Sequence, residues 1–143
     1  MATTSDAILD RIRSLCIGPP FYWTEATSSE SFALDAMATA ATGAFRATIR
    51  GSTVRGGTGY SEERTDAVSV EVQRTIDADY DATRRALHRA ANSLTTAIIR
   101  DGHETSGDYA VPDAGRVVEV IGTPGAAFLT LRLTVPVNYE SQV

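Results

Sequence analysis

The chain offers few of the side chains that commonly carry out catalysis. His88 and His103 are its only histidines, Cys16 is its only cysteine, and it contains no lysine. Neither histidine has a second histidine or a cysteine at the spacing that zinc sites use. A hydrolytic dyad is conceivable at His103 and Glu104, but no Gly-x-Ser-x-Gly motif accompanies them. We therefore expect no catalytic residue, no bound cofactor and no metal site, and predict that the protein is not an enzyme.

A glycine- and arginine-rich segment over residues 51–66 is the leading candidate for a functional site. It is longer than an ordinary hairpin loop, and loops of this length in compact domains are usually functional or disordered. A phosphate-binding loop of the Gly-x-x-x-x-Gly-Lys-Ser/Thr type is excluded, because the chain lacks lysine. We predict a mobile loop, and leave open whether it is an interaction loop or a tip without function. Its candidate contact residues are Arg55, Gly56, Gly57, Tyr60 and Arg64.

Three arginines, Arg84, Arg85 and Arg89, form a second candidate interface on the polar side of a predicted helix. They could meet an acidic surface or a phosphate backbone. The favoured alternative is a solvated helix face, on which Asp81 balances two of them at i+3 and i+4 spacing. Exposed pairs of this kind are common and individually weak.

Composition limits the function classes that remain. The 143 residues suffice for one domain with one core, and 43% hydrophobic content is in the globular range. A formal net charge of -5 argues against broad binding to nucleic acid, because its field repels phosphates. The lone cysteine cannot form an internal disulfide. The chain shows neither a secretory signal nor an apolar run of the roughly 18 residues that a membrane span needs. We expect a protein made in the cytoplasm, without membrane contact.

Apolar residues at helical spacing predict a first helix. Its cap should be Ser5 or Asp6, and it should end at Gly18, which two prolines follow. The aromatic triplet over residues 21–23 comes directly afterwards. Consecutive side chains alternate faces in extended backbone, so one or two of these aromatics should anchor the segment in the core and the remainder should be exposed or covered by a partner.

A second, long amphipathic helix is predicted in the middle of the chain. Asp77 or Asp79 should cap it, and it should run to about Arg100, where Gly102 ends it. Its acidic beginning and basic end complement the helix dipole. The polar stretch after it, over residues 101–115, is predicted to be a second mobile loop.

Alternating apolar and polar residues predict four strands, over residues 45–50, 68–76, 117–121 and 128–135. Pro136 cannot donate a ladder hydrogen bond, which predicts that the last strand ends at a sheet edge. Residues 24–31 are typical of a loop, and residues 32–42 do not distinguish helix from strand. The elements together predict an α+β fold over residues 1–143: a single domain with one small, mostly antiparallel sheet, on which the N-terminal helix and the long amphipathic helix pack.

The element order and the closing segment Leu133-Thr134-Val135-Pro136-Val137-Asn138-Tyr139-Glu140 resemble the tail terminator proteins of long-tailed bacteriophages and the related tail-completion or neck proteins. The resemblance covers most of the chain, from Asp6 to Glu140, as architecture. It implies a structural virion protein, assembled in the host cytoplasm, that forms a homo-hexameric ring. Such a ring caps the tail tube, stops its polymerisation and presents a surface to the head connector.

The resemblance also implies the partners: further copies of the chain, the tail tube protein, the head connector protein and, transiently, DNA that passes through the ring. The sheet edges and the Arg55–Arg64 loop would make the ring and tube contacts. Three alternatives stay open. They are a head-tail connector or stopper protein, a nonviral small-molecule-binding or enzymatic α+β domain with a cleft between helix 78–100 and the sheet, and a nonviral interaction module.

Overall fold

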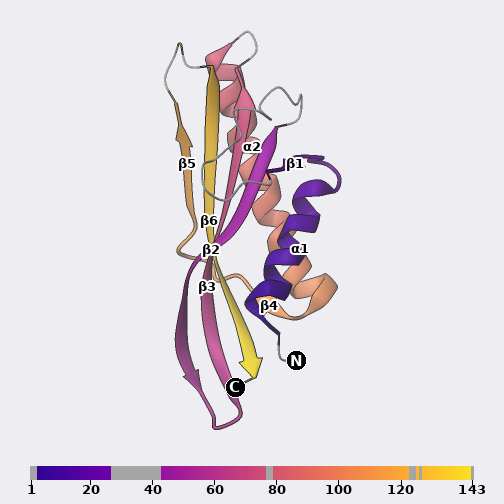
Figure 1. The fold of residues 1–143 in the computed structure, drawn as a ribbon, viewed down its shortest axis with the longest axis vertical. Coiled ribbons are helices and arrows are strands. Elements are labelled where there is room, and N and C mark those ends of the chain that lie inside the picture. Colours follow the sequence, from indigo (N-terminus) through magenta and orange to yellow (C-terminus); the bar gives the residue numbers. More distant parts are fainter. Residues whose placement is uncertain (1–2, 27–42, 77–78, 123–124, 126, 143) are drawn as a thin grey trace.

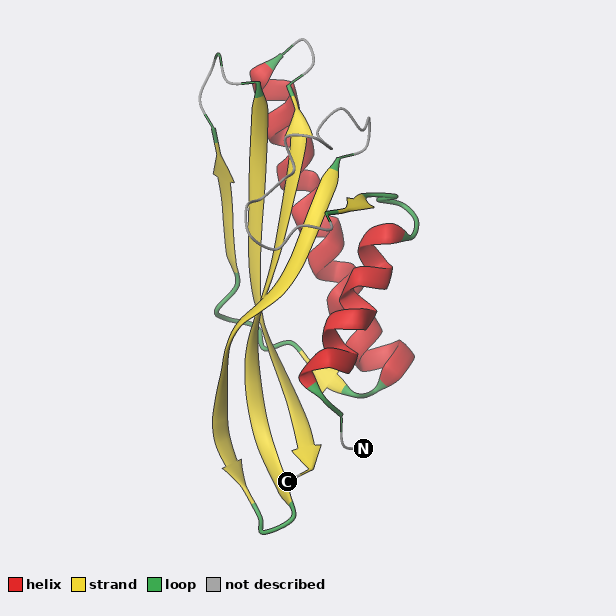
Figure 2. Cartoon of the chain, in the orientation of Figure 1, coloured by secondary structure: helices red, strands yellow, loops and turns green. Residues whose placement is uncertain are grey.

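Both helices pack on one side of a long, twisted sheet (Figures 1 and 2). The computed structural model describes residues 3–26, 43–76, 79–122, 125 and 127–142. In chain order the elements are α1 (Ser5–Ile17), β1 (Thr24–Glu25), β2 (Ala44–Gly57), β3 (Ser61–Thr75), α2 (Tyr80–Arg100), the π-helical turn η2 (Asp101–Ser106), β4 (Tyr109–Ala110), β5 (Val117–Ile121) and β6 (Phe128–Gln142). The predicted α+β class is confirmed.

Among the described residues, six strands form one sheet in the order β1-β2-β3-β6-β4, and β5 also pairs with β6. The pairing of β1 with β2 is parallel and every other pairing is antiparallel. The short strand β1 occupies two positions of the predicted loop 24–31. Residues 27–31 of that loop and the ambiguous segment 32–42 lie outside the described residues.

The N-cap of helix α1 lies one residue before the two residues predicted for it. Thr4 is the N-cap, because its Oγ1 accepts a hydrogen bond from Ala7 N at 3.2 Å. Ser5 and Asp6 lie inside the first turn, so their prediction as caps is wrong. The apolar face contacts the sheet through Ile8, Ile12 and Cys16, which are buried at i, i+4 and i+8.

The aromatic triplet after α1 divides as predicted. Phe21 and Trp23 are buried and their ring centroids lie 4.6 Å apart, whereas Tyr22 is 60% exposed. Trp23 also lies 6.5 Å from Phe45 at the start of β2. These contacts fix the end of α1 to the sheet.

Helix α2 begins at the predicted cap, since Asp79 Oδ1 accepts from Asp81 N at 3.0 Å. Its core-facing residues include Leu87, Ala91, Leu94 and Ile98. The prediction that Gly102 ends the helix is wrong, because the chain continues through η2 to Gly107, whose φ is 68°. Gly102 instead permits close packing: a Cβ there would lie 2.5 Å from the Tyr109 ring. The predicted loop 101–115 therefore contains η2 and β4.

The core lies between the helices and the alternate residues of three long strands. Val72, Val70 and Val68 of β3 face the helices, and their register partners in β6 are Leu131, Leu133 and Val135. This confirms the predicted buried face of the last strand. The strand continues past Pro136 to Gln142, so its predicted end is wrong, but Pro136 does lie at a local edge of the described sheet. Pro136 is tolerated because the pairing with β5 stops at Thr134 and the pairing with β4 begins at Asn138.

The prediction of a loop over residues 51–66 is also wrong. Strands β2 and β3 extend through it as a long antiparallel hairpin, which turns at residues 58–60. Thr58 Oγ1 accepts from Tyr60 N and Ser61 N at 3.3 Å, and Thr58 N donates to Ser61 O at 2.8 Å. Backbone pairing rather than apolar burial forms these strands, which is why hydrophobic alternation did not reveal them.

Candidate functional site

The far half of the β2–β3 hairpin projects beyond the helices. Its turn forms one tip of the molecule, past the ends of α1 and η2 (Figure 1). The end of β6 accompanies it, since Ser61 pairs with Gln142 and Arg64 with Tyr139. All residues from 50 to 57 are exposed. This part of β2 therefore offers a large accessible surface without contributing to the core.

The structure brings together at this tip the predicted contact residues Arg55, Gly56, Gly57, Tyr60 and Arg64. Tyr60 is 87% exposed at the turn. Arg64 Nε donates to Glu62 Oε2 at 3.0 Å, and Arg55 Nη1 lies 3.9 Å from Glu63 Oε2. The Arg55–Glu63 pair is exposed and the Arg64–Glu62 pair is half-buried, so Arg55 is the more accessible of the two guanidiniums.

The two glycines before the turn have different roles. A Cβ at Gly57 would lie 2.5 Å from the Ser61 carbonyl oxygen, so only glycine permits this close approach of the strands. A Cβ at Gly56 would meet nothing within 4 Å. Gly57 therefore shapes the hairpin, and Gly56 leaves open space beside Arg55.

Two β-bulges interrupt β2, and the extra residue is arginine in both. The register passes from Ile49 to Gly51 and from Val54 to Gly56, which leaves Arg50 and Arg55 without a partner residue in β3. A bulge bends the strand and redirects a side chain. Each bulge therefore sets an arginine apart from the regular alternation of the hairpin.

The outer edge of β2 is open over most of its length. The pairing with β1 covers only Ala44 and Phe45, and no other described strand pairs with this side of β2. Residues 46–57 span about 40 Å at roughly 3.3 Å per residue. A row of backbone donors and acceptors of this kind can accept a strand from another chain.

The second predicted interface lies elsewhere. Arg84, Arg85 and Arg89 are exposed on α2, and none forms an ion pair with another described residue, so the predicted balance by Asp81 is absent. The first turns of α2 lie at the end of the molecule opposite the hairpin turn (Figure 1). The two predicted interfaces are therefore separate surfaces.

A row of alternating charges crosses the sheet on the face opposite the helices, and sequence analysis missed it. The register aligns Arg46, Glu71, Arg132 and Glu119 across β2, β3, β6 and β5. Glu71 is 5% exposed and accepts from Arg46 Nη2 at 3.1 Å and from Arg132 Nη2 at 3.3 Å. Arg50 Nη2 lies 3.6 Å from the same carboxylate. The available signal was the occurrence of charges in the middle of three predicted strands.

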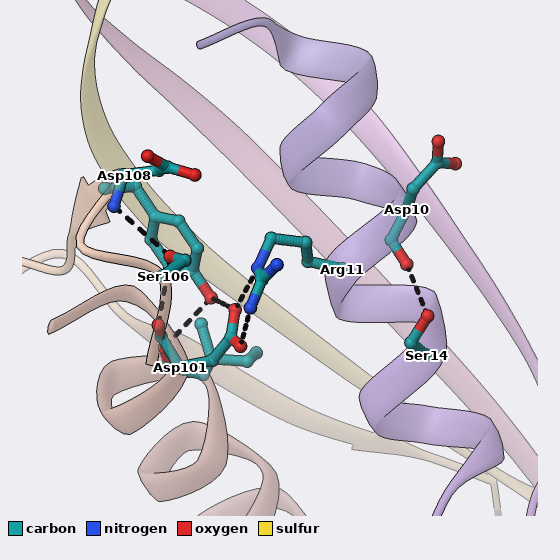
Figure 3. Close-up of polar contacts among 8 residues, drawn as sticks. Asp10, Arg11, Ser14, Asp101, Ser106 and Asp108 are labelled. Atoms are coloured by element: carbon teal, nitrogen blue, oxygen red, sulfur yellow. Dashed lines mark hydrogen bonds and ion pairs between the residues drawn. The ribbon is translucent and has the colours of Figure 1, made fainter. Parts of the chain in front are cut away.

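A buried carboxylate joins α1 to the end of α2. Asp101, 7% exposed, accepts from Arg11 Nε at 3.0 Å and from Arg11 Nη2 at 2.7 Å (Figure 3). The Tyr109 hydroxyl lies 2.7 Å from Asp101 Oδ2 and 3.1 Å from the Ile98 carbonyl. Ser106 Oγ donates to the Asp101 carbonyl at 3.0 Å. This network closes η2 against both helices.

Arg11 and Asp101 each stabilise the charged form of the other. Burial alone would raise the pKa of Asp101, but hydrogen bonds from Arg11 and Tyr109 and the charge of Arg11 outweigh it and lower the pKa. The hydrogen bond to Asp101 raises the pKa of Arg11. Burial, followed by the bond to Asp101, raises the pKa of Tyr109. The arrangement holds a charged pair and a neutral phenol, which suits a structural link.

A second buried carboxylate lies beneath the start of α1. Asp66 is fully buried, and its Oδ1 accepts from the Tyr139 hydroxyl at 3.1 Å. Because that bond uses the only hydroxyl proton of Tyr139, Ser5 Oγ donates to Tyr139 at 2.7 Å. This chain of bonds joins the first turn of α1 to β3 and β6.

The two histidines lie on different elements, His88 on α2 and His103 in η2. A surface hollow of about 340 Å³ includes His103, Asp108 and Glu140 in its lining. The Asp108 carboxylate points away from the Asp101–Arg11 pair (Figure 3). No hydrogen bond joins it to His103, and the described residues contain no group of three or more His, Cys, Asp or Glu that could hold a metal. His88 lies half-buried on α2.

Within the described ranges, none of the helices has the length and apolar character required to cross a membrane. No model of a known protein family matches this chain, and no curated protein matches it in sequence.

Proposed function

We propose that the protein is a structural assembly subunit that forms a ring, as the resemblance to phage tail terminators implies. The observation that carries this proposal is the projecting hairpin, whose β2 edge pairs with no other described strand from residue 46 to residue 57. Strand edges and projecting hairpins are surfaces through which identical chains pair. In the proposed role the ring caps the tail tube and joins it to the head connector.

The charges of the two candidate surfaces fit this role. The hairpin presents Arg55 and Tyr60, an exposed cation and an exposed aromatic ring, and such residues are enriched at protein interfaces. Arg84, Arg85 and Arg89 lie toward the opposite end of the molecule, where a different partner would bind. A subunit with contacts at both ends suits a position between two other components.

The small-molecule-binding alternative finds little support. The face of α2 toward the sheet is filled by buried side chains such as Leu87, Leu94 and Ile98. Its two buried threonines bond their own helix, since Thr83 Oγ1 donates to Asp79 O and Thr95 Oγ1 donates to Ala91 O. These hydroxyl protons are therefore not available to a ligand between α2 and the sheet.

Deletion of the gene from its source phage or prophage, followed by electron microscopy of the lysate, tests the proposal. Overlong tails beside filled heads without tails are the expected result. Emptied heads with free tails of normal length would replace the terminator role with the connector role. Normal infectious particles would refute the neck function. In parallel, light scattering of the purified chain should give the mass of a closed oligomer.

A further inference from the structure

The sheet has a second open edge besides β2. Strand β5 pairs with β6 on one side, and no described strand pairs with its other side. Val117 and Ile121 of β5 are 47% and 46% exposed, and the exposed Glu119 lies between them. The sheet order places β5 and β2 on opposite sides of the β3–β6 pair. One molecule therefore presents two different open edges.

The charges of these edges determine which pairs can form. Residues 44–57 contain three arginines and no acidic residue, so two β2 edges placed side by side bring like charges together. Strand β5 carries one charged residue, the acidic Glu119. Its flanking Val117 and Ile121 would lose their exposed apolar surface against a neighbour. Pairing of β5 with β2 is favoured over pairing of β2 with itself.

The bulges of β2 further restrict the partner. They leave two short regular stretches, residues 46–49 and 51–54, because Arg50 and Arg55 interrupt the ladder. A long strand would meet both interruptions, whereas the five residues of β5 need only one regular stretch and its immediate neighbour. The exposed Val54, at the second bulge, offers an apolar contact.

We propose that β5 of one copy adds to the outer edge of β2 of the next copy, so that the sheets continue from subunit to subunit. This inference rests on the proposed ring and names its interface. The contact is heterologous, because it joins two different edges, and repetition with rotation closes it into a ring. Glu119 meets Arg55 of the neighbour. Arg55 is the more available bulge arginine, since its acidic neighbour Glu63 is exposed, whereas Arg50 contacts the buried Glu71.

Charge reversal with compensation tests the proposed pair. Glu119→Arg and Arg55→Glu should each raise the dissociation constant of the oligomer at least tenfold, measured on the full chain by analytical ultracentrifugation. The double variant should recover most of the lost affinity, because it reverses both charges of one pair. Glu104→Arg and Arg100→Glu make the same charge changes at an exposed ion pair away from both edges, and should leave the mass unchanged.

A pair of proline variants tests the backbone pairing itself. Ser52 and Thr53 are neighbours in β2, so the N–H of one points to β3 and the N–H of the other to the open edge. Circular dichroism melting should identify the substitution that destabilises the fold, and the other should leave the fold intact and abolish association. Retained association in the stably folded variant would overturn the inference.

The outcomes separate this inference from the proposed function. A wild-type ring whose mass survives both Glu119→Arg and Arg55→Glu refutes the edge pairing and leaves the ring itself in place. Loss of association in both single variants without recovery in the double variant also refutes the Glu119–Arg55 pair. A wild-type chain that stays monomeric at every concentration refutes both. Normal phage particles after gene deletion refute the neck function alone.

Discussion

Replacing Arg11 by methionine should lower the free energy of unfolding by about 2–4 kcal/mol, because it leaves the carboxylate of Asp101 buried without its cation. The Asp101 side chain is 8% exposed, whereas Arg11 is 37% exposed, which moderates the cost by solvent screening. Methionine keeps most of the apolar stem of arginine, so the variant removes mainly the charge and its two hydrogen bonds.

Arg13 provides a matched control on the same helix. Its side chain is 39% exposed, close to the value for Arg11, but its partners Asp10 and Glu25 are 72% and 36% exposed. Arg13→Met should therefore cost less than about 1 kcal/mol. Urea unfolding followed by circular dichroism, at one protein concentration because association adds stability, gives both values. Equal losses in the two variants would refute the assignment of the cost to the buried partner.

The pH dependence adds a second check. The pKa of Asp101 is lowered in the folded protein, so its stabilisation is present above its usual value of about 3.9 and is lost as pH falls through the folded value. The difference between wild type and Arg11→Met should therefore shrink as pH falls through the folded pKa of Asp101. A difference that stays constant from pH 7 to the acid limit of folding would contradict the ion-pair explanation.

Three further perturbations have defined outcomes. Glu71→Gln leaves three guanidiniums around a neutral side chain and should cost about 1–3 kcal/mol in urea unfolding, more than Glu63→Gln at the exposed hairpin. Gly57→Ala should lower the melting temperature, because its Cβ would clash with the Ser61 carbonyl, whereas Gly56→Ala should change it little. Burial raises the pKa of the Cys16 thiol to about 12, so a thiol reagent at pH 8 should modify it only in urea; rapid labelling of the folded chain would contradict this.

Sequence periodicity located the elements that bury apolar residues. It predicted α1, α2 and the helix-facing side of β6, because these depend on residues that recur at helical or strand spacing, such as Ile8, Leu94 and Leu131. It did not locate the far half of β2, because residues 50–57 bury nothing and owe their conformation to pairing with β3. This pairing is made by backbone hydrogen bonds across the hairpin, which the alternation of apolar side chains does not reveal.

The candidate functional surfaces were predictable to a similar, partial degree. Arg55 and Tyr60 were found as exposed candidates because their glycine-rich surroundings exclude a core role. The charge row centred on Glu71 was missed because its members are far apart in sequence and meet only through the register of β2, β3 and β6. The Asp101–Arg11 link was missed for the same reason, since 90 positions separate its members.

The same features that protect the β2 edge from indiscriminate pairing also suit it to a single partner. Arginines and bulges on an edge strand discourage aggregation, and like charges oppose pairing of one β2 with another. Such an edge accepts a short strand of opposite charge at lower cost, and β5 with Glu119 has both properties. A ring requires this selectivity, because self-pairing of one edge would give a closed dimer and leave β5 unused. In the proposed ring, the basic, bulged edge of β2 would exclude self-pairing and accept the one contact that can propagate from subunit to subunit.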